Sequence, residues 1–262
     1  MSEQNKFDEL LLRYDRALDG IREAGGEDVR LVVAAKYATS EELDALCEHR
    51  GLDVIGENRT DTLIEHYEGM KNRVEIHFIG HLQRNKVKSI IDKVSLIHSL
   101  ESLGLAEEIE KQSAKRGTVT RVLAEINIGR EESKSGLMPE ALSDFCLELA
   151  KYPHVELCGF MTMGPIFERE EAYRAYFKQT VTLGNTICRQ SIPGKIKVDT
   201  KTKCNVISPY LEGVVACIAD LHRQGEIIGH NTLIENSQYD VWNTLCYTRR
   251  VDGTTPCRHL RQ

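Results

Sequence analysis

Residues 31–36 read Leu31-Val32-Val33-Ala34-Ala35-Lys36, which is a short apolar run followed at once by a lysine. The run is too short for a typical helix, and its β-branched content is typical of a buried strand in a parallel sheet. A helix-start pattern, Thr39-Ser40-Glu41-Glu42, comes next and begins a helix that ends near Gly51. The segment therefore predicts one β/α unit with a lysine at the end of its strand.

The same alternation recurs along the chain to about residue 180. Further strands are expected at 53–55, 75–79, 96–99, 121–128 and 156–161, each followed by a helical pattern, and a helix at 7–21 precedes the first strand. Strands that alternate with helices imply right-handed βαβ units and a parallel sheet. Periodicity leaves two α/β architectures open: a doubly wound sheet, or a β/α barrel, which needs eight units and about 250 residues.

The composition is that of a soluble globular protein. The chain has 262 residues, of which 41% are hydrophobic and 28% charged, and its formal net charge is −6. Acidic and basic residues are interspersed, so we expect no nucleic-acid surface. There is no apolar targeting segment at the start and no apolar run that would span a bilayer, so we expect a cytoplasmic protein. The eight cysteines are irregularly spaced, and most should remain thiols there.

Residues 181–262 lack the clear rhythm of the preceding chain. They carry five of the eight cysteines and the single tryptophan, Trp242. A helix is expected at 211–228, and the best short strand candidates are 203–208 and 226–229. No Cys or His spacing in this part matches a zinc site, so we expect no metal. We divide the chain into a barrel portion, 1–180, and an atypical tail, 181–262.

Lys36 is the principal candidate for chemistry. Ligands of parallel β/α folds bind at the carboxyl ends of the strands, where this lysine stands. A partly desolvated amine in that place is suited to Schiff-base formation with a carbonyl compound. The competing interpretation is a strand-end lysine that extends into solvent, and position alone favours it.

Polar residues also follow the next strands. Asn58 can direct a donor and an acceptor into the mouth of a barrel, although capping of the following helix explains it equally well. His77 and His81 stand near the end of the third strand, but no third metal ligand accompanies them in a recognisable motif, and a lone histidine in a strand is more often a hydrogen-bonded core residue. Asn127, near the end of the fifth strand, is expected in a hydrogen-bond network.

Five ordered blocks resemble one family, the pyridoxal phosphate homeostasis proteins, also described as alanine-racemase N-terminal-domain-like proteins. The match covers residues 1 to about 180 and rests on Val33-Ala34-Ala35-Lys36, Gly56-Glu57-Asn58, His77-Phe78-Ile79-Gly80-His81-Leu82-Gln83-Arg84-Asn85-Lys86, Asn127-Ile128 with Glu132-Ser133-Lys134-Ser135-Gly136, and Gly159-Phe160-Met161-Thr162-Met163.

The resemblance implies a (β/α)8 TIM-type barrel with a leading N-terminal helix. It also implies pyridoxal 5′-phosphate (PLP) held as a Schiff base on Lys36, with Asn58 and His77 at positions near the cofactor. The family is similar to the barrel half of fold-type III enzymes, without the domain that supplies a racemase with its second acid/base group. The implied role is therefore cofactor homeostasis without strong catalysis, in a monomer whose partners are PLP and PLP-dependent apo-enzymes.

The end of the chain departs from the family pattern. The family carries a Ser-Met-Gly-Met-Ser element and an Arg-x-Gly element on its last two strands, where they hold the phosphate, and neither is found after Thr180. The last two β/α units are therefore expected to be atypical or missing. An out-of-frame or misassembled ending is the favoured explanation; a diverged tail and a replacement that abolished cofactor binding are the alternatives.

Three functions remain to be compared. The first is a PLP carrier. The second is a small fold-type III PLP enzyme, such as an amino-acid racemase, with Tyr210 or a cysteine of the tail as its second acid/base group. The third is a degenerate barrel that no longer retains PLP, which the missing late motifs alone favour.

Overall fold

The structure, a computed structural model, describes residues 3–23, 30–132, 134–163, 170–189, 215–219 and 244–247. Six strands follow one another in chain order and pair in parallel, each with the next: β1 (Leu31–Ala34), β2 (Val54–Glu57), β3 (Glu75–Phe78), β4 (Leu96–Leu100), β5 (Thr120–Glu125) and β6 (Val155–Met163). In a doubly wound sheet the order of the strands reverses at a switch point, and the order of these six strands shows no such reversal. The α/β prediction is confirmed, and the strands lie close to their expected positions.

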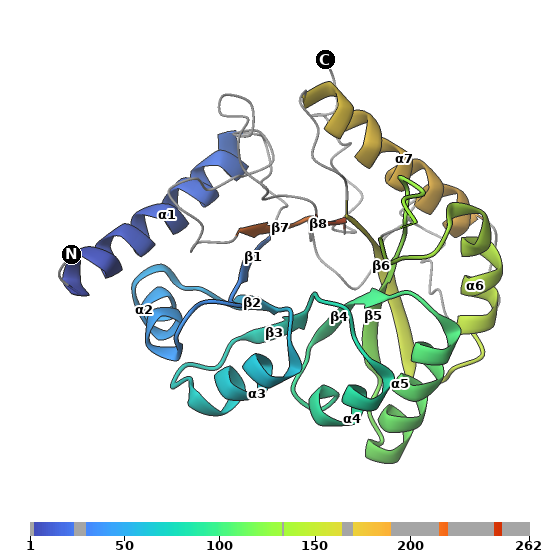
Figure 1. The fold of residues 1–262 in the computed structure, drawn as a ribbon, viewed down its shortest axis with the longest axis horizontal. Helices are drawn as coiled ribbons and strands as arrows, with labels where there is room; N and C mark the ends of the chain where they lie inside the picture. The colour runs from blue at the N-terminus through green and yellow to red at the C-terminus, as the bar shows by residue number, and fades with distance from the viewer. Residues whose placement is uncertain are drawn as a thin grey trace.

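Helices lie outside the strands (Figure 1). They are α1 (Glu3–Glu23), α2 (Ser40–Arg50), α3 (Thr60–Gly69), α4 (Val87–Ile90) after a 3₁₀ turn (Arg84–Lys86), α5 (Leu103–Arg116), α6 (Leu142–Leu149) after a second such turn (Pro139–Ala141), and α7 (Glu170–Arg189). Of these, α2 to α6 connect successive strands from β1 to β6. The predicted start of α2 is confirmed in detail, because Thr39 and Glu42 form a reciprocal capping box. Helix α7 runs across residue 180, and the division of the chain there stays a prediction.

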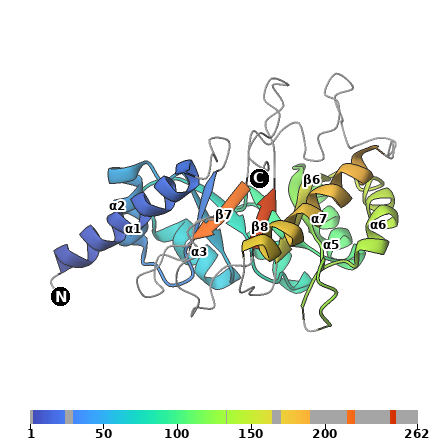
Figure 2. The same cartoon turned by 90° about the horizontal axis from the view of Figure 1, so that it is seen from above.

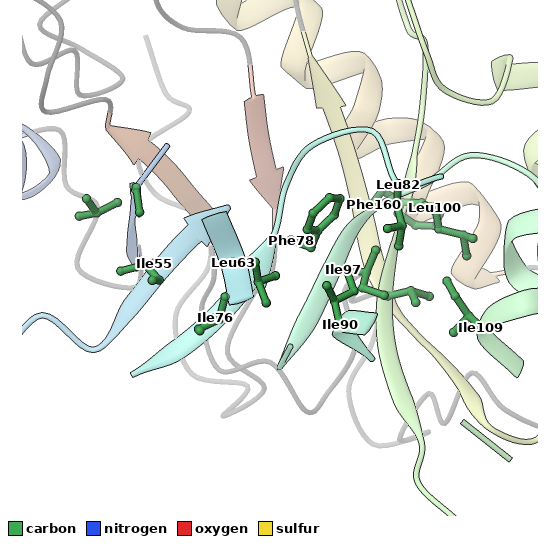
Figure 3. Packing of buried hydrophobic residues seen from close by; sticks show 14 of the residues in the cluster. Ile55, Leu63, Ile76, Phe78, Leu82, Ile90, Ile97, Leu100, Ile109 and Phe160 are labelled. Atoms are coloured by element: carbon green, nitrogen blue, oxygen red, sulfur yellow. The ribbon is translucent and has the colours of Figure 1, made fainter. Parts of the chain in front are cut away.

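Buried apolar residues form two clusters, which lie on opposite faces of the sheet. The larger cluster joins strands to helices; Figure 3 shows strand residues such as Ile55, Phe78 and Ile97 packed with helix residues such as Leu63 and Ile109. The smaller cluster draws on the sheet and its immediate ends alone: Val32, Ala34, Val54, Ile79, Leu96, Leu123, Cys158 and Met161. Successive strand residues point to opposite faces, so the smaller cluster marks the inner face, away from the helices.

Two more strands lie between β6 and β1 (Figure 2). Strand β8 (Thr244–Tyr247) pairs antiparallel with both β6 and β7 (Val215–Ala219), and β7 pairs in parallel with β1, so the strand order returns to its start. An antiparallel strand is not a β/α repeat, so the last two units are atypical, as predicted.

The helix expected at 211–228 is wrong at residues 215–219, which form β7. The residues Val215 to Ala219 are an uninterrupted apolar run, and such a run fits a buried strand as well as it fits one face of a helix. The strands expected at 203–208 and 226–229 lie outside the described residues.

Replacement of Phe78 by alanine should test the helix-facing core. Phe78 is among the largest fully buried side chains, so Phe78→Ala should lower the free energy of unfolding by about 3–5 kcal/mol. The control is Leu12→Ala on α1, where a half-exposed side chain should cost less than about 1 kcal/mol. Urea denaturation of both variants measures the difference, and equal losses would contradict the assignment of the core.

Candidate functional site

The inner face continues beyond the strands to the residues predicted for the site. Val32 and Ala34 belong to the inner cluster, and the same alternation leads to Lys36, which is partly buried. A Cβ on Gly56 would lie 3.1 Å from Val32 Cγ1, so Gly56 also faces inward, and Asn58 is the next residue on that side. Lys36 and Asn58 thus share one edge of the sheet.

His77 lies on the same face but deeper. Its neighbours Ile76 and Phe78 belong to the helix-facing cluster, so the imidazole points inward. Strand pairing sets Ala34 beside Gly56 and Gly56 beside His77. Lys36 and Asn58 stand two positions beyond this row, which is about 6–7 Å further along the strands. The structure therefore brings the predicted residues together in two layers, with His77 in the lower one.

A closed turn presents Lys36. The Ala38 amide donates to the Ala35 carbonyl over 2.9 Å, and Lys36 and Tyr37 are its two central residues. The Ala35 amide in turn donates to the Gly56 carbonyl, also over 2.9 Å, which fixes the turn to β2. The Lys36 ammonium lies 5.1 Å from the centre of the Tyr37 ring, and Tyr37 is 61% exposed. The lysine is thus held at the rim of the sheet by backbone contacts.

A buried pair of histidines forms the lower layer. His98 Nε2 lies 3.0 Å from His77 Nδ1, and His77 Nε2 lies 3.5 Å from a Glu75 carboxylate oxygen. Burial lowers the pKa of both imidazoles, and only the Glu75 carboxylate opposes this effect at His77. Near neutral pH both rings are therefore uncharged. The sequence did not lead us to predict His98, although its position on β4, the strand next to that of His77, could have indicated it.

Asn58 does not cap the following helix. The N-cap of α3 is Arg59, and no side chain caps that helix. Instead the Asn58 backbone lies against Gly80, where an added Cβ would come within 2.8 Å of the Asn58 carbonyl carbon and Cα. Gly80, in the loop after β3, therefore permits a close approach of two loops at the rim, and the capping interpretation of Asn58 is wrong.

Glu125 adds a titratable carboxyl that sequence reasoning did not single out. It ends β5 on the same face as Leu123 of the inner cluster, and it is buried. Burial, with a smaller contribution from the charge of Glu101, raises the pKa of Glu125 to about 7. The carboxyl is thus poised to gain or lose a proton near neutral pH.

Asn127 shapes the loop that follows β5. Its amide nitrogen donates to the carbonyl oxygens of Glu131 and Lys134, at 2.8 and 3.3 Å, and its amide oxygen accepts from the Glu131 backbone at 3.0 Å. This confirms the predicted hydrogen-bond network. Because both ends of the amide are used within the loop, Asn127 is a structural residue of the rim.

Within the described ranges, no three His, Cys, Asp or Glu residues are grouped so that they could hold a metal ion. Over the same ranges, no helix combines the length and the apolar character needed to cross a membrane. Tyr210 lies outside the described residues, whereas two cysteines of the tail, Cys217 and Cys246, lie on β7 (Val215–Ala219) and β8 (Thr244–Tyr247).

Comparisons with known proteins agree with this architecture. Residues 14–198 match the family described as alanine racemase, N-terminal domain. A pyridoxal phosphate homeostasis protein of Aquifex aeolicus is 38% identical over 184 residues, which are 68% of this chain and 81% of that protein. A crystal structure of a Bifidobacterium adolescentis protein described as unknown has a TM-score of 0.67 and 28% identity, over 74% of this chain and 85% of that one.

PipY of Synechococcus elongatus, in a structure with PLP bound, has a TM-score of 0.60 over 70% of this chain and 83% of its own. Its sequence is only 21% identical, so this likeness concerns the fold alone.

The glycine at the rim can be tested directly. Gly80→Ala should lower the free energy of unfolding by about 1–3 kcal/mol, because the new Cβ would collide with the Asn58 backbone. Gly104→Ala on α5 is the matched control, since the nearest atom would be the flexible end of Arg84 at 3.3 Å. Helix propensity should then leave the control neutral or stabilise it by up to about 1 kcal/mol. A Gly80→Ala protein as stable as the parent would argue against the close approach.

Glu125 should make stability depend on pH. Its pKa in the folded protein is raised, so the folded state holds this proton more tightly than the unfolded chain does. The stability that the Glu125 proton contributes is therefore lost as the pH rises from the pKa of Glu125 in the unfolded chain toward its pKa of about 7 in the folded protein. Glu125→Gln should gain stability relative to the parent, by up to about 3 kcal/mol, between pH 5 and pH 8. Chemical denaturation of both proteins at pH 5 and at pH 8 measures the difference in their free energies of unfolding. The same difference at both pH values would contradict the raised pKa of Glu125.

Proposed function

We propose that this chain, which belongs to the family of pyridoxal phosphate homeostasis proteins with the alanine racemase N-terminal domain, binds PLP as a Schiff base on Lys36. The observation that carries the proposal is the anchored turn that presents Lys36 at the carboxyl end of β1. Ligand sites of parallel β/α folds lie at that edge. The family membership then identifies the carbonyl compound.

The described residues fit the aldehyde end of PLP. When bound, PLP supplies an aldehyde that can be exchanged between amines. The Lys36 amine nitrogen would form the C=N bond with the aldehyde carbon as one water molecule leaves. Asn58, half-buried on the same edge, offers donors and an acceptor to polar atoms of the ring. The two elements that the family resemblance places at the phosphate are not found in this sequence, so we assign no residue to the phosphate.

We assign His77 a supporting role in this site. Its ring nitrogens face His98 and Glu75, and its strand position is one layer below Lys36. A neutral, hydrogen-bonded pair gives the inner face a fixed polar floor. His77 would thus define the depth to which the cofactor enters.

We further propose that the protein carries PLP and does not turn over a substrate. The curated relative from Aquifex aeolicus is named for pyridoxal phosphate homeostasis, and a carrier needs a reversible bond and an open rim, which Lys36 and its exposed neighbour Tyr37 offer. PLP-dependent apo-enzymes are the acceptors that this role requires. A cytoplasmic monomer remains our expectation.

One observation favours the second candidate, a small PLP enzyme. Glu125 is a buried carboxyl with a pKa of about 7, and it ends a strand on the inner face. Such a group could exchange a proton with a bound amino acid. Loss of amino-acid racemisation in Glu125→Gln, from a measurable rate in the parent, would support this candidate. The carrier role predicts no racemisation by either protein.

Borohydride trapping tests the proposed linkage. Reduction after incubation with PLP should leave a phosphopyridoxyl group on Lys36, located by peptide mass spectrometry, and Lys36→Ala should lose this labelling and the absorbance of the Schiff base. The control is Lys115→Ala on the exposed end of α5, which should label as the parent does. Equal labelling of Lys36→Ala and the parent would exclude Lys36 as the site.

A further inference from the structure

We propose that His66, clamped by Glu57, is a positioning residue that fixes the turn carrying Lys36. The inference rests on the proposed function only for its meaning, because the contacts belong to the protein without cofactor. Glu57 stands two residues after Ile55 of the helix-facing cluster and so points to the same side of β2, and His66 lies on α3 on that side, so neither would touch a ligand at the rim. They act through the turn alone.

The clamp joins three elements. Glu57, the last residue of β2, has one carboxylate oxygen 2.6 Å from His66 Nδ1 on α3, and its other oxygen accepts from the Thr62 hydroxyl at 2.7 Å. His66 Nε2 lies 3.1 Å from the carbonyl oxygen of Ala38, the closing residue of the Lys36 turn. The two charged side chains are 5% and 0% exposed. The strand therefore holds the helix, and the helix holds the turn.

Counting protons shows what the clamp requires. The Ala38 carbonyl only accepts, so His66 Nε2 must carry a hydrogen. Another hydrogen must lie between His66 Nδ1 and the Glu57 carboxylate. Both contacts therefore coexist when the pair holds two protons, as imidazolium and carboxylate or as their neutral equivalent. Removal of one proton leaves either Glu57 or Ala38 without its partner.

The charges around His66 favour the protonated form. Burial by itself lowers its pKa, but the Glu57 hydrogen bond and charge, the Ala38 carbonyl and the charge of Glu65 together raise the pKa above the ordinary value. Glu57 acts from β2 and Glu65 from α3, and among the described residues the turn contributes only the carbonyl. Because the folded pKa is raised, the stabilisation is complete below the unfolded pKa and is lost as pH rises through the folded value. The Lys36 turn should therefore loosen at alkaline pH.

Glu57→Gln separates the clamp from its proton requirement. A glutamine can donate its amide hydrogen to the Nδ1 atom of a neutral His66 while its oxygen still accepts from Thr62. His66 Nε2 then keeps its hydrogen for Ala38 without the second proton. This variant should hold the turn as the parent does at acidic pH, and it should go on holding it at alkaline pH.

Hydrogen exchange of the protein without PLP tests the inference. After correction for intrinsic rates, exchange of the peptide containing residues 35–39 should rise at least about tenfold in the parent between about pH 6 and about pH 9, and should stay nearly constant in Glu57→Gln. His66→Leu should exchange fast at every pH if it folds. His154→Gln is the matched control, because it removes a His–Glu contact of 2.7 Å before β6, away from the turn, and should behave as the parent does.

Two results would overturn the inference: a parent-like pH dependence in Glu57→Gln, or a parent whose turn exchanges at a constant corrected rate. Other groups that titrate in this range, such as Glu125, are still present in Glu57→Gln. A loss of the pH dependence in that variant would therefore exclude them as its cause. Borohydride trapping in the same variants keeps the two proposals apart. Absence of label on Lys36 in every variant contradicts PLP binding, whereas unaltered exchange with normal labelling contradicts only the clamp.

Discussion

Parallel pairing of the first three strands is the constraint on which the candidate site depends. It aligns Ala34, Gly56 and His77 in one row across the sheet. Because side chains on one face of a strand recur every two residues, the remaining site residues, Lys36 and Asn58, lie one layer above that row. A shift of β2 by one residue would turn Asn58 toward the helices and Glu57 toward the rim. The site and the clamp behind it are therefore two faces of the same short strand, and neither could change its alignment without the other.

The rim consists of turns whose backbones are held in place by hydrogen bonds and close packing. Lys36 sits in a turn closed on itself and bonded to β2, while Asn58 is pressed against Gly80. Asn127 ties its own loop together with both ends of its amide. Such backbone-anchored turns reduce the conformational freedom that binding would otherwise have to remove.

Local patterns were sufficient for most of the fold. The short apolar run at 31–35 and the capping box at Thr39 each depend on neighbours in sequence, and both the strand and the helix start are confirmed. The segment Val215–Ala219 was mistaken for helix, because its strand character comes from pairing with β1 and β8, which no local pattern records. Antiparallel pairing of β8 was equally beyond reach for the same reason.

The site was predictable in part. Lys36 and Asn58 stand directly after strands, so their edge followed from the β/α rhythm. The depth of His77 did not, because depth depends on the alignment of neighbouring strands. The partners that define chemistry, His98 for His77 and His66 for Glu57, are separated in sequence by 21 and 9 residues and meet only in the folded chain. The pKa of Glu125 likewise arises from burial, which residue type alone does not reveal.

The uncharged histidine layer has a consequence for spectroscopy. A chromophore bound above it would experience no change of charge from below over the neutral range, because burial keeps His77 and His98 deprotonated there. Any change of colour with pH would then report on groups outside this histidine layer, such as the buried Glu125 carboxyl with its pKa of about 7. The two histidines themselves would contribute a constant background to the visible spectrum of a loaded protein.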